Sequence, residues 1–568
     1  MRRSAALASV TMTAVLALTA CGGGGGAGGT GTGAGTGAGT SSGPGAPAAT
    51  GGTVHILAKA DFSHLDPARG WDGGVNNFYR LIYRGLTMFG AGPGAEGTKV
   101  VPDLATDTGT PSDGGKTWTY KLKDNLFFED GTPINSEAVK FGFSRTFDPE
   151  AGIGSPYGKL LLDAPKDYKG PYLDGDLKTI ETPDDKTVVF HLKKPLADFP
   201  SALAMVNFTP FPKGTGAGAA FDTKPIASGP YKVASYQRGV SLKLERNPQW
   251  KRETDSVRAA KPDAFEWTFG LDPATIDERM LAGQGTDADA LGPSIQAATV
   301  ARVQQPQIKQ RTLSGLNGCT TYMGLNTTKK PLNDVRVRQA INYAINKDTV
   351  VAGMGGGALA AKGTSIQPPT IAGRVDYDLY PYNPEEAKKL LAEAGLADGF
   401  SLTLDTRPDP KMAAVAVAIQ DALKQVKIDV KINNIDTSTF YEVIGTPAQQ
   451  HDAAVTGWCP DWASGATFLP PLFDGRNITP KGNSNLAQLN DKGINERIDE
   501  IAAMTDVNQA NAAYGELDKE IMKLAPVVPL AYEKLILLVG SNIAGAYQSN
   551  SFSGGIDLIS VGLAKPTK

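Results

Sequence analysis

Histidine and cysteine are scarce in this chain of 568 residues. The four histidines, His55, His64, His191 and His451, stand far apart, and there are only three cysteines. A zinc site is built from ligands at short spacings such as CxxC or HxxxH, and the chain has neither pattern. The sequence therefore predicts no metal site and no cofactor. An extracellular hydrolase would need a paired acid, a serine and histidine constellation or a metal, and no HExxH motif or histidine cluster supports it.

An excess of one charge and long apolar runs are also missing. The chain has 56 lysines and arginines against 59 aspartates and glutamates, which makes the formal net charge −3. Without the basic cluster that a phosphate backbone demands, nucleic acid is not an expected partner. Beyond the N-terminal segment no apolar run is long enough to cross a bilayer, so we expect a globular body. This length exceeds what one hydrophobic core organises and predicts two or three domains.

The N-terminal segment has the pattern of an export signal. Arg2 and Arg3 precede an apolar stretch over 5–17, which is too short for a bilayer core that needs roughly 20 residues. The stretch ends in Leu18-Thr19-Ala20-Cys21 and resembles the lipobox of bacterial lipoproteins, in which cleavage precedes a cysteine that receives a diacylglycerol. We expect a signal peptide over 1–20 and a lipid on Cys21 that anchors an extracytoplasmic protein to the outer face of the cell membrane. The alternative is an ordinary secretory cleavage site beside a chance cysteine.

The next segment, residues 22–52, is almost wholly Gly, Ala, Thr, Ser and Pro. Such a composition cannot bury enough apolar surface to fold, so we predict a flexible tether over 21–52 with a reach of about 30 Å. With Cys21 lipidated, Cys319 and Cys459 remain in an oxidising compartment, where an even number of cysteines usually pairs. We therefore predict one disulfide.

Turn and alternation signals predict β-structure in the N-terminal half. The segment 109–117 (GTPSDGGKT) has five residues where a phosphate-binding loop has four, and its Asp-Gly-Gly is typical of a hairpin turn. Trp118, Tyr120 and Leu122 then alternate with polar residues, which predicts a strand. Another strand is predicted over 187–193, with His191 on its polar side as a surface residue.

The C-terminal half has the pattern of an open α/β sheet. A helix is marked at both ends between Asn383 and Gly395. A strand over 400–405, a helix over 411–426 and a strand over 428–432 form a predicted βαβ unit, and a third strand follows at 452–456. Open α/β sheets bind ligands beyond the carboxyl ends of their strands. We therefore place the site in Gly457-Trp458-Cys459-Pro460-Asp461-Trp462.

Several motifs in a fixed order resemble one family. They are Leu65-Asp66-Pro67, LIYRGL at 81–86, FEDGTPINSEAVKFGFSR at 128–145, SGPYKV at 228–233, and PLNDVRVRQA at 331–340 leading into AINK at 344–347. Over nearly the whole mature chain they resemble the large, cluster C substrate-binding proteins of ABC importers, which include oligopeptide-, dipeptide- and nickel-binding proteins. The GWCPDW segment and the two body cysteines are most similar to the oligopeptide-binding branch, where the resemblance implies a disulfide between Cys319 and Cys459.

The resemblance implies an α/β fold of the type II periplasmic-binding-protein kind, with two hinged lobes and an extra subdomain inserted in lobe I. Lobe I is expected over 53–86, 223–320 and 526–568, the inserted subdomain over 87–222, and lobe II over 321–525. The chain then crosses between the lobes twice, and closure of such a hinge buries a ligand. The expected protein is a monomer that is not an enzyme and that delivers its ligand to ABC transporter permease subunits.

By the same resemblance, an oligopeptide binds in the cleft like an added strand. The main chain of 457–459 pairs with the peptide, and 71–73 approach from the opposite wall. Asp461 aligns with the aspartate that receives the ligand's α-ammonium, since a buried ammonium without a counter-charge is expensive. The candidate ligand-binding residues are Trp71, Asp72, Gly73, Gly457, Trp458, Cys459, Asp461, Trp462 and Tyr532.

Other interpretations of these residues stay open. Asp461 alternatively caps a turn or helix after the strand, and Trp458 and Trp462 alternatively pack in a core or between the lobes. The oligopeptide branch carries an acid where this chain has Trp71, so the cleft rim is less charged. Such a cleft would also suit an oligosaccharide, because pyranose faces stack on indole rings. A sensor lipoprotein that presents its ligand to a membrane receptor is a further hypothesis.

Overall fold

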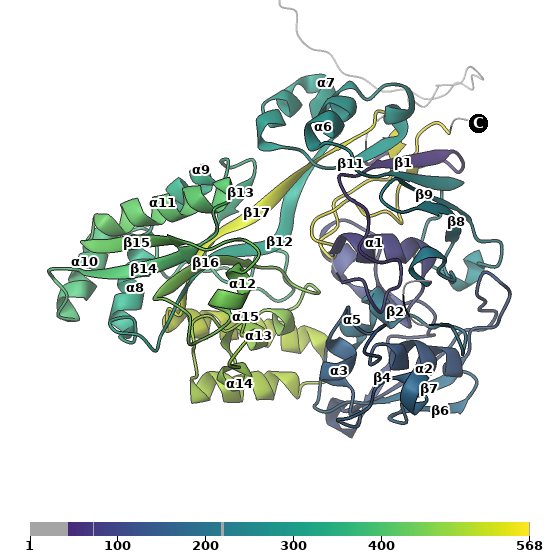
Figure 1. Ribbon diagram of the computed structural model, residues 1–568, viewed down its shortest axis with the longest axis horizontal. Helices are drawn as coiled ribbons and strands as arrows, with labels where there is room; N and C mark the ends of the chain where they lie inside the picture. The colour runs from purple at the N-terminus through teal and green to yellow at the C-terminus, as the bar shows by residue number, and fades with distance from the viewer. Residues whose placement is uncertain (1–43, 72, 217, 219–220, 567–568) are drawn as a thin grey trace, which may run out of the picture. The chain divides into compact units, whose positions relative to one another are not determined.

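The computed structural model describes residues 44–71, 73–216, 218 and 221–566 (Figure 1). The predicted signal peptide, Cys21, Asp72 and most of the predicted tether lie outside the described residues. Within these ranges no helix is long and apolar enough to cross a membrane.

The end of the predicted tether is bound to the body instead of free. Ala49 forms a β-bridge with Leu563, and the Ala546 N–H donates to the Pro44 carbonyl at 2.7 Å. The prediction that the tether reaches residue 52 was therefore wrong for residues 44–52, because their backbone groups find partners near the C-terminus.

A mixed sheet of 11 strands runs through the body. Its strands are β1 (Thr53–Leu57), β8 (Tyr231–Gln237), β9 (Ser241–Arg246), β10 (Ala264–Thr268), β11 (Ala290–Ser294), β12 (Thr312–Leu325), β13 (Ala360–Lys362), β14 (Phe400–Thr406), β15 (Ile428–Asn434), β16 (Ala453–Trp458) and β17 (Val527–Val539). The order is β15-β14-β16-β12-β17-β11-β1-β10-β9-β8, and β13 pairs with β17 off this path.

The first lobe holds the β1, β8 to β11 end of this sheet. Its helices are α1 (Gly73–Ile82), α6 (Pro273–Ala282) and α7 (Pro306–Lys309), and β18 (Ile543–Ala544) pairs with β19 (Gly562–Leu563). β1 is parallel to both β10 and β11. Phe78 of α1 packs on Trp267 of β10 with ring centroids 5.4 Å apart, in a core with Leu244 of β9. This packing holds α1, whose first residue reaches the site described below.

A separate sheet of four strands has its own core. Its order is β4-β5-β7-β6, from β4 (Thr110–Ser112), β5 (Thr117–Lys121), β6 (Ile180–Asp184) and β7 (Thr187–His191). Nearby elements are β2 (Thr87–Phe89), β3 (Val100–Pro102), α2 (Ser136–Arg145), α3 (Tyr157–Leu161), α4 (Pro171–Asp174) and α5 (Phe199–Leu203). The predicted hairpin is confirmed, since β4 and β5 pair antiparallel and Trp118, Tyr120 and Leu122 are buried. His191 lies at the surface with its Nε2 2.9 Å from Glu181, as predicted.

The second lobe is a sheet with helices on both faces. The helices are α8 (Val335–Ala344), α9 (Lys347–Gly353), α10 (Pro384–Glu393), α11 (Pro410–Lys424), α12 (Phe440–Ile444), α13 (Leu469–Phe473), α14 (Lys492–Ala502) and α15 (Val507–Lys523). Successive side chains of a strand point to opposite faces. Met323 of β12 accordingly packs with residues of α8 to α11, and Tyr322 packs with residues of α13 to α15.

The elements predicted in this lobe are confirmed. Asn383 caps α10 by accepting from the Glu386 N–H, and β14 pairs in parallel with β15 and β16. β16 runs two residues beyond the predicted end at 456, because Gly457 and Trp458 continue its pairing with β12.

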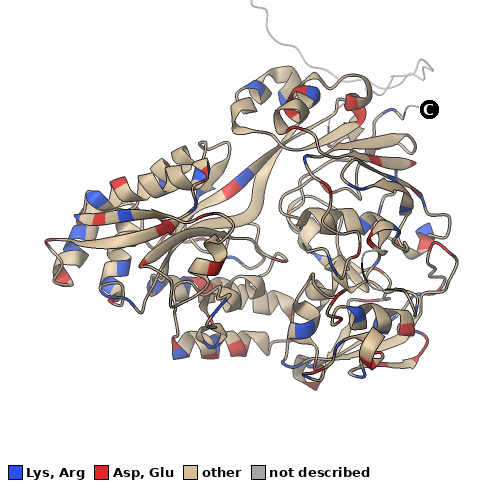
Figure 2. Ribbon diagram, viewed as in Figure 1, with Lys and Arg blue, Asp and Glu red and all other residues tan. Residues whose placement is uncertain are grey.

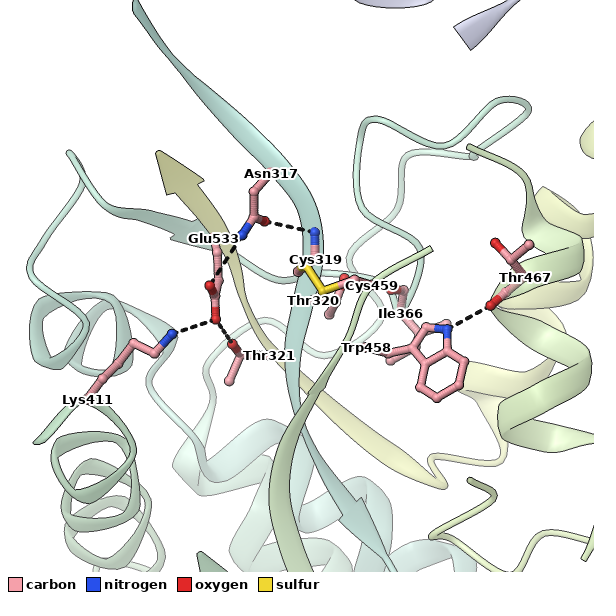
Figure 3. The surroundings of a disulfide bond; sticks show 10 residues. All are labelled: Asn317, Cys319, Thr320, Thr321, Ile366, Lys411, Trp458, Cys459, Thr467 and Glu533. Atoms are coloured by element: carbon pink, nitrogen blue, oxygen red, sulfur yellow. Dashed lines mark hydrogen bonds and ion pairs between the residues drawn. A yellow bond between two sulfur atoms is a disulfide. The ribbon is translucent and has the colours of Figure 1, made fainter. Parts of the chain in front are cut away.

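Strands β12 and β17 pass through both lobes as one antiparallel pair (Figure 1). Leu313 opposite Leu537 belongs to the first lobe, and Met323 opposite Val528 belongs to the second. The register shifts between Leu316 and Thr320. At this irregularity Cys319 is joined to Cys459 by a disulfide, as predicted, so the segment after β16 is tied to β12 (Figure 3).

Reduction of this disulfide is expected to lower the melting temperature by several degrees. The bond joins residues 140 positions apart, and chain entropy then limits its contribution to roughly 5 kcal/mol. Thermal denaturation with and without reductant measures the effect, and a Cys319→Ser/Cys459→Ser variant is the control that should not respond. Two free thiols in the unfolded, non-reduced protein would contradict the bond.

Candidate ligand-binding site

A cavity of about 150 Å³ gathers four of the nine candidate residues. Trp71, Gly73, Cys459 and Asp461 line it together with Phe552. Gly73 begins α1, and Asp461 follows the end of β16, so elements of both lobes form the walls. A Cβ at Gly73 would meet the Ser553 Oγ at 2.3 Å, so a larger residue there would displace the Ser553 side chain. The structure thus brings together residues that are nearly 400 positions apart.

The Asp461 carboxylate is held by a residue that the sequence did not indicate. The Tyr157 hydroxyl, at the start of α3, donates to Asp461 Oδ2. Burial raises the pKa of the Asp461 carboxyl, and this hydrogen bond partly offsets the rise. The alternative role as a helix cap does not apply, since Ser464 caps the short helix η9 (Gly465–Thr467). A tyrosine 304 positions upstream offers no local signal of this contact.

Trp462 is an interface aromatic, which was one of the two roles considered for it. It is 4% exposed and packs in one cluster with Phe89, Met205 and Phe552 of the first lobe. Its ring centroid lies 4.9 Å from that of Tyr157. The Trp71 ring approaches Tyr157 edge-on, with ring centroids 5.7 Å apart. Tyr157 therefore contacts two of the predicted tryptophans.

Trp458 and Tyr532 lie away from the cavity. The Trp458 Nε1 donates to the Thr467 carbonyl at 2.7 Å, and the ring packs against the core of the second lobe (Figure 3). Tyr532 is 3% exposed, and its hydroxyl accepts from the backbone N–H groups of Thr364 and Ser365 at 3.0 Å. Both side chains therefore make contacts within the second lobe.

The main chain of β16 has an unpaired edge at its C-terminal end. Gly457 and Trp458 pair with Thr321 and Thr320 of β12 on one side. On the other side β14 pairs with β16 only at Ala453 and Ala454, and no other strand in the described part of the chain continues that edge. An edge of this kind is a template for an added strand.

A second cavity of about 550 Å³ is lined by Phe89 and Trp462 of the same aromatic cluster. Phe89, Trp118 and Asp198 line it from the first lobe, and Trp462, Ser464 and Asn511 line it from the second. The Trp462 Nε1 donates to Asp198 Oδ2 at 3.0 Å, so an indole and a carboxylate join the two walls. Asp198 was not among the predicted residues.

Charged groups of both signs are distributed over the described part of the chain. Figure 2 shows lysine and arginine interspersed with aspartate and glutamate over the ribbon. Across the described ranges no group of three or more histidine, cysteine, aspartate or glutamate side chains could hold a metal ion.

Comparison with known proteins identifies the class. Residues 99–480 match the family described as bacterial extracellular solute-binding proteins, family 5, middle region. A glutathione-binding protein of Salmonella typhi is 27% identical over 514 residues, which cover 88% of this chain and 92% of that protein. Heme-binding protein A of Haemophilus influenzae is 28% identical over 526 residues, with coverage of 87% and 90%.

A solved structure agrees with this match. The clavulanic acid biosynthesis oligopeptide binding protein 2 is 33% identical, with a TM-score of 0.86, and covers 93% of this chain and 100% of its own. The fold is the two-lobed type II periplasmic-binding-protein fold that the resemblance implied. The chain belongs to family 5 of the bacterial extracellular solute-binding proteins.

Replacing Asp461 with asparagine is expected to stabilise the ligand-free protein increasingly as the pH rises. Because burial raises the pKa of this carboxyl, the native state holds a proton that the unfolded chain loses above about pH 3.9. The parent protein therefore loses stability with rising pH until the raised pKa is passed. Asparagine does not ionise and avoids this loss. The melting temperatures of variant and parent, measured from about pH 4 to pH 7, give the difference in stability. A difference that becomes smaller as the pH rises would contradict the raised pKa of Asp461.

Proposed function

We propose that this protein captures an oligopeptide between its lobes and delivers it to the permease of an ABC importer. One observation carries the proposal: Asp461 and Gly73, the first residue of α1, line one cavity together with Cys459, and Cys459 directly follows the unpaired edge of β16. A carboxylate there suits the α-ammonium of a peptide, and an open strand edge suits its backbone. These two groups occur in every peptide, so the site would accept many side chains.

Binding in this cleft requires the lobes to move apart, since they contact each other through Tyr157 and Trp462. We place lobe I at 53–86, 223–320 and 526–568, its inserted subdomain at 87–222, and lobe II at 321–525. Val528 and Leu530 at the start of β17 still pack in the second core, so this strand changes lobes a few residues after 525. On these boundaries the hinge is the β12–β17 pair, where the register irregularity at 316–320 lies between the two cores.

An oligosaccharide is the second candidate, and the tryptophans support it less well. The Trp462 face is packed within the aromatic cluster, and Trp458 packs on the second-lobe core. Only Trp71 combines partial exposure with a place in the 150 Å³ cavity. Stacking of a pyranose would need a free indole face. A peptide, held by main-chain and carboxylate groups, therefore has more partners in this cleft.

The name of one relative, a glutathione-binding protein, and that of the solved oligopeptide binding protein agree with a peptide ligand. The relative named a heme-binding protein shows that the ligand class differs between relatives of this chain. The proposal also includes a lipid anchor on Cys21, which would hold the body at the outer face of the membrane. A sensor role would use the same lobes and differ only in the membrane partner.

Short peptides are expected to be released when the purified full-length protein is denatured, and mass spectrometry identifies them. Asp461→Ala should weaken binding of a released peptide by about 2 to 5 kcal/mol, because the ligand's ammonium loses its counter-charge. Calorimetry measures this, with Asp429→Asn, an exposed aspartate on β15, as the matched control. A released sugar, or unchanged peptide affinity in Asp461→Ala, would overturn the ammonium site.

Replacing Cys21 with alanine is expected to move the protein from the membrane fraction to the soluble fraction. The lipid is attached to the cysteine sulfur in the lipoproteins that this segment resembles, and two acyl chains or more are needed for stable anchoring. Cell fractionation with immunoblotting measures the distribution. A variant that stays in the membrane fraction while cleaved at the same residue would argue against lipidation of Cys21.

A further inference from the structure

The 550 Å³ cavity has a buried carboxylate on its wall. Asp198 precedes α5 and is 3% exposed. Its Oδ2 accepts from the Trp462 Nε1, whereas its Oδ1 has no hydrogen-bond partner of normal geometry among the described residues. Asp198 also lines the cavity. A carboxyl on the cavity wall thus has one buried oxygen without a hydrogen-bond partner within the described ranges.

No positive charge is found beside Asp198 in the described part of the chain. The side chains that act on its carboxyl, those of Ser464, Trp462 and Ser201, are all uncharged. Burial raises the pKa of the carboxyl, and the neighbouring Ser464, Trp462 and Ser201 side chains partly offset the rise. A buried carboxylate without a partner is costly, and a positive group in the cavity would remove that cost.

The other walls of the cavity are partly aromatic. Phe89, Trp118 and Trp462 line it, and all three are buried. Rings of this kind limit the access of water, and a carboxylate attracts a cation more strongly where water is excluded. Besides Asp198, two charged residues line the cavity, Glu96 and Lys99. They have opposite charges and both are exposed, so they do not set the charge of the cavity's interior.

We propose that this cavity is a second recognition site that takes a positively charged side chain of the ligand, with Asp198 Oδ1 as its acceptor. The inference rests on the proposed peptide-binding function and adds a preference for basic peptides. Only two aromatic side chains, Tyr157 and Trp462, separate the Asp461 carboxyl from that of Asp198. A single peptide would then place its α-ammonium at Asp461 and a lysine-type or arginine-type side chain at Asp198.

Matched peptide pairs test this site on the full-length protein. Tripeptides to pentapeptides are compared by calorimetry with lysine or the uncharged norleucine at each position in turn. The parent protein is expected to bind the lysine peptide at least 10-fold more tightly at one position. Asp198→Asn should lose that preference, since asparagine can still accept from the Trp462 indole but has no charge.

Two further variants separate the two sites. Glu96→Gln removes a charge from the rim of the same cavity and should keep the lysine preference. Asp461→Asn should weaken both peptides of a pair alike and also keep the preference. If Asp198→Asn does not fold, n-butylamine replaces it as a probe, and it should compete with the lysine peptide but not with the norleucine peptide on the parent protein.

The outcomes are distinguishable. Peptides that bind the parent protein without a lysine preference at any position overturn this inference and leave the proposed function standing. If the folded Asp198→Asn variant keeps the preference for the lysine peptide, this inference is also overturned and the proposed function still stands. If no peptide of either kind binds the parent protein, the proposed function fails and this inference fails with it.

Discussion

The antiparallel pairing of β12 with β17 is the constraint on which the rest of the structure depends. The two strands contribute side chains to the cores of both lobes, from Leu537 in the first to Met323 in the second. The disulfide ties Cys459 to Cys319 at the irregular part of this pair. The segment that carries Asp461 and Trp462 is therefore attached at the place where the lobes meet. Motion about this ladder would open the cleft without displacing that segment from β12.

The two lobes meet through polar contacts that involve carboxylates. Tyr157 donates to Asp461, and Trp462 donates to Asp198. Burial raises the pKa of both acids, so the ligand-free interface carries a cost that cationic groups of a ligand would relieve. Groups held in this way reduce stability and are typical of binding sites. In this fold the binding energy of a ligand would be tied to closure of the lobes.

Local signals predicted the second lobe well and the interface poorly. The cap at Asn383 and the βαβ unit after it depend on residues a few positions apart, and both are as predicted. The family motifs indicated Asp461 and Trp71, which do line one cavity. Tyr157 and Asp198 were missed because their partners lie 304 and 264 positions away. No periodicity or capping pattern reports contacts across that distance.

The amino-acid sequence was enough to predict the family, the helices and strands of the second lobe and the pairing of the two body cysteines. These follow from short motifs, turn chemistry and an even number of cysteines, all of which act through nearby residues or simple counting. Other facts emerge only from the folded chain. Tyr157 donates a hydrogen bond to Asp461, and Trp462 is buried between the lobes. Asp198 lines a cavity and has one carboxyl oxygen without a hydrogen-bond partner in the described part of the chain. Those facts depend on how two separately folded lobes meet, which is set by packing between distant segments.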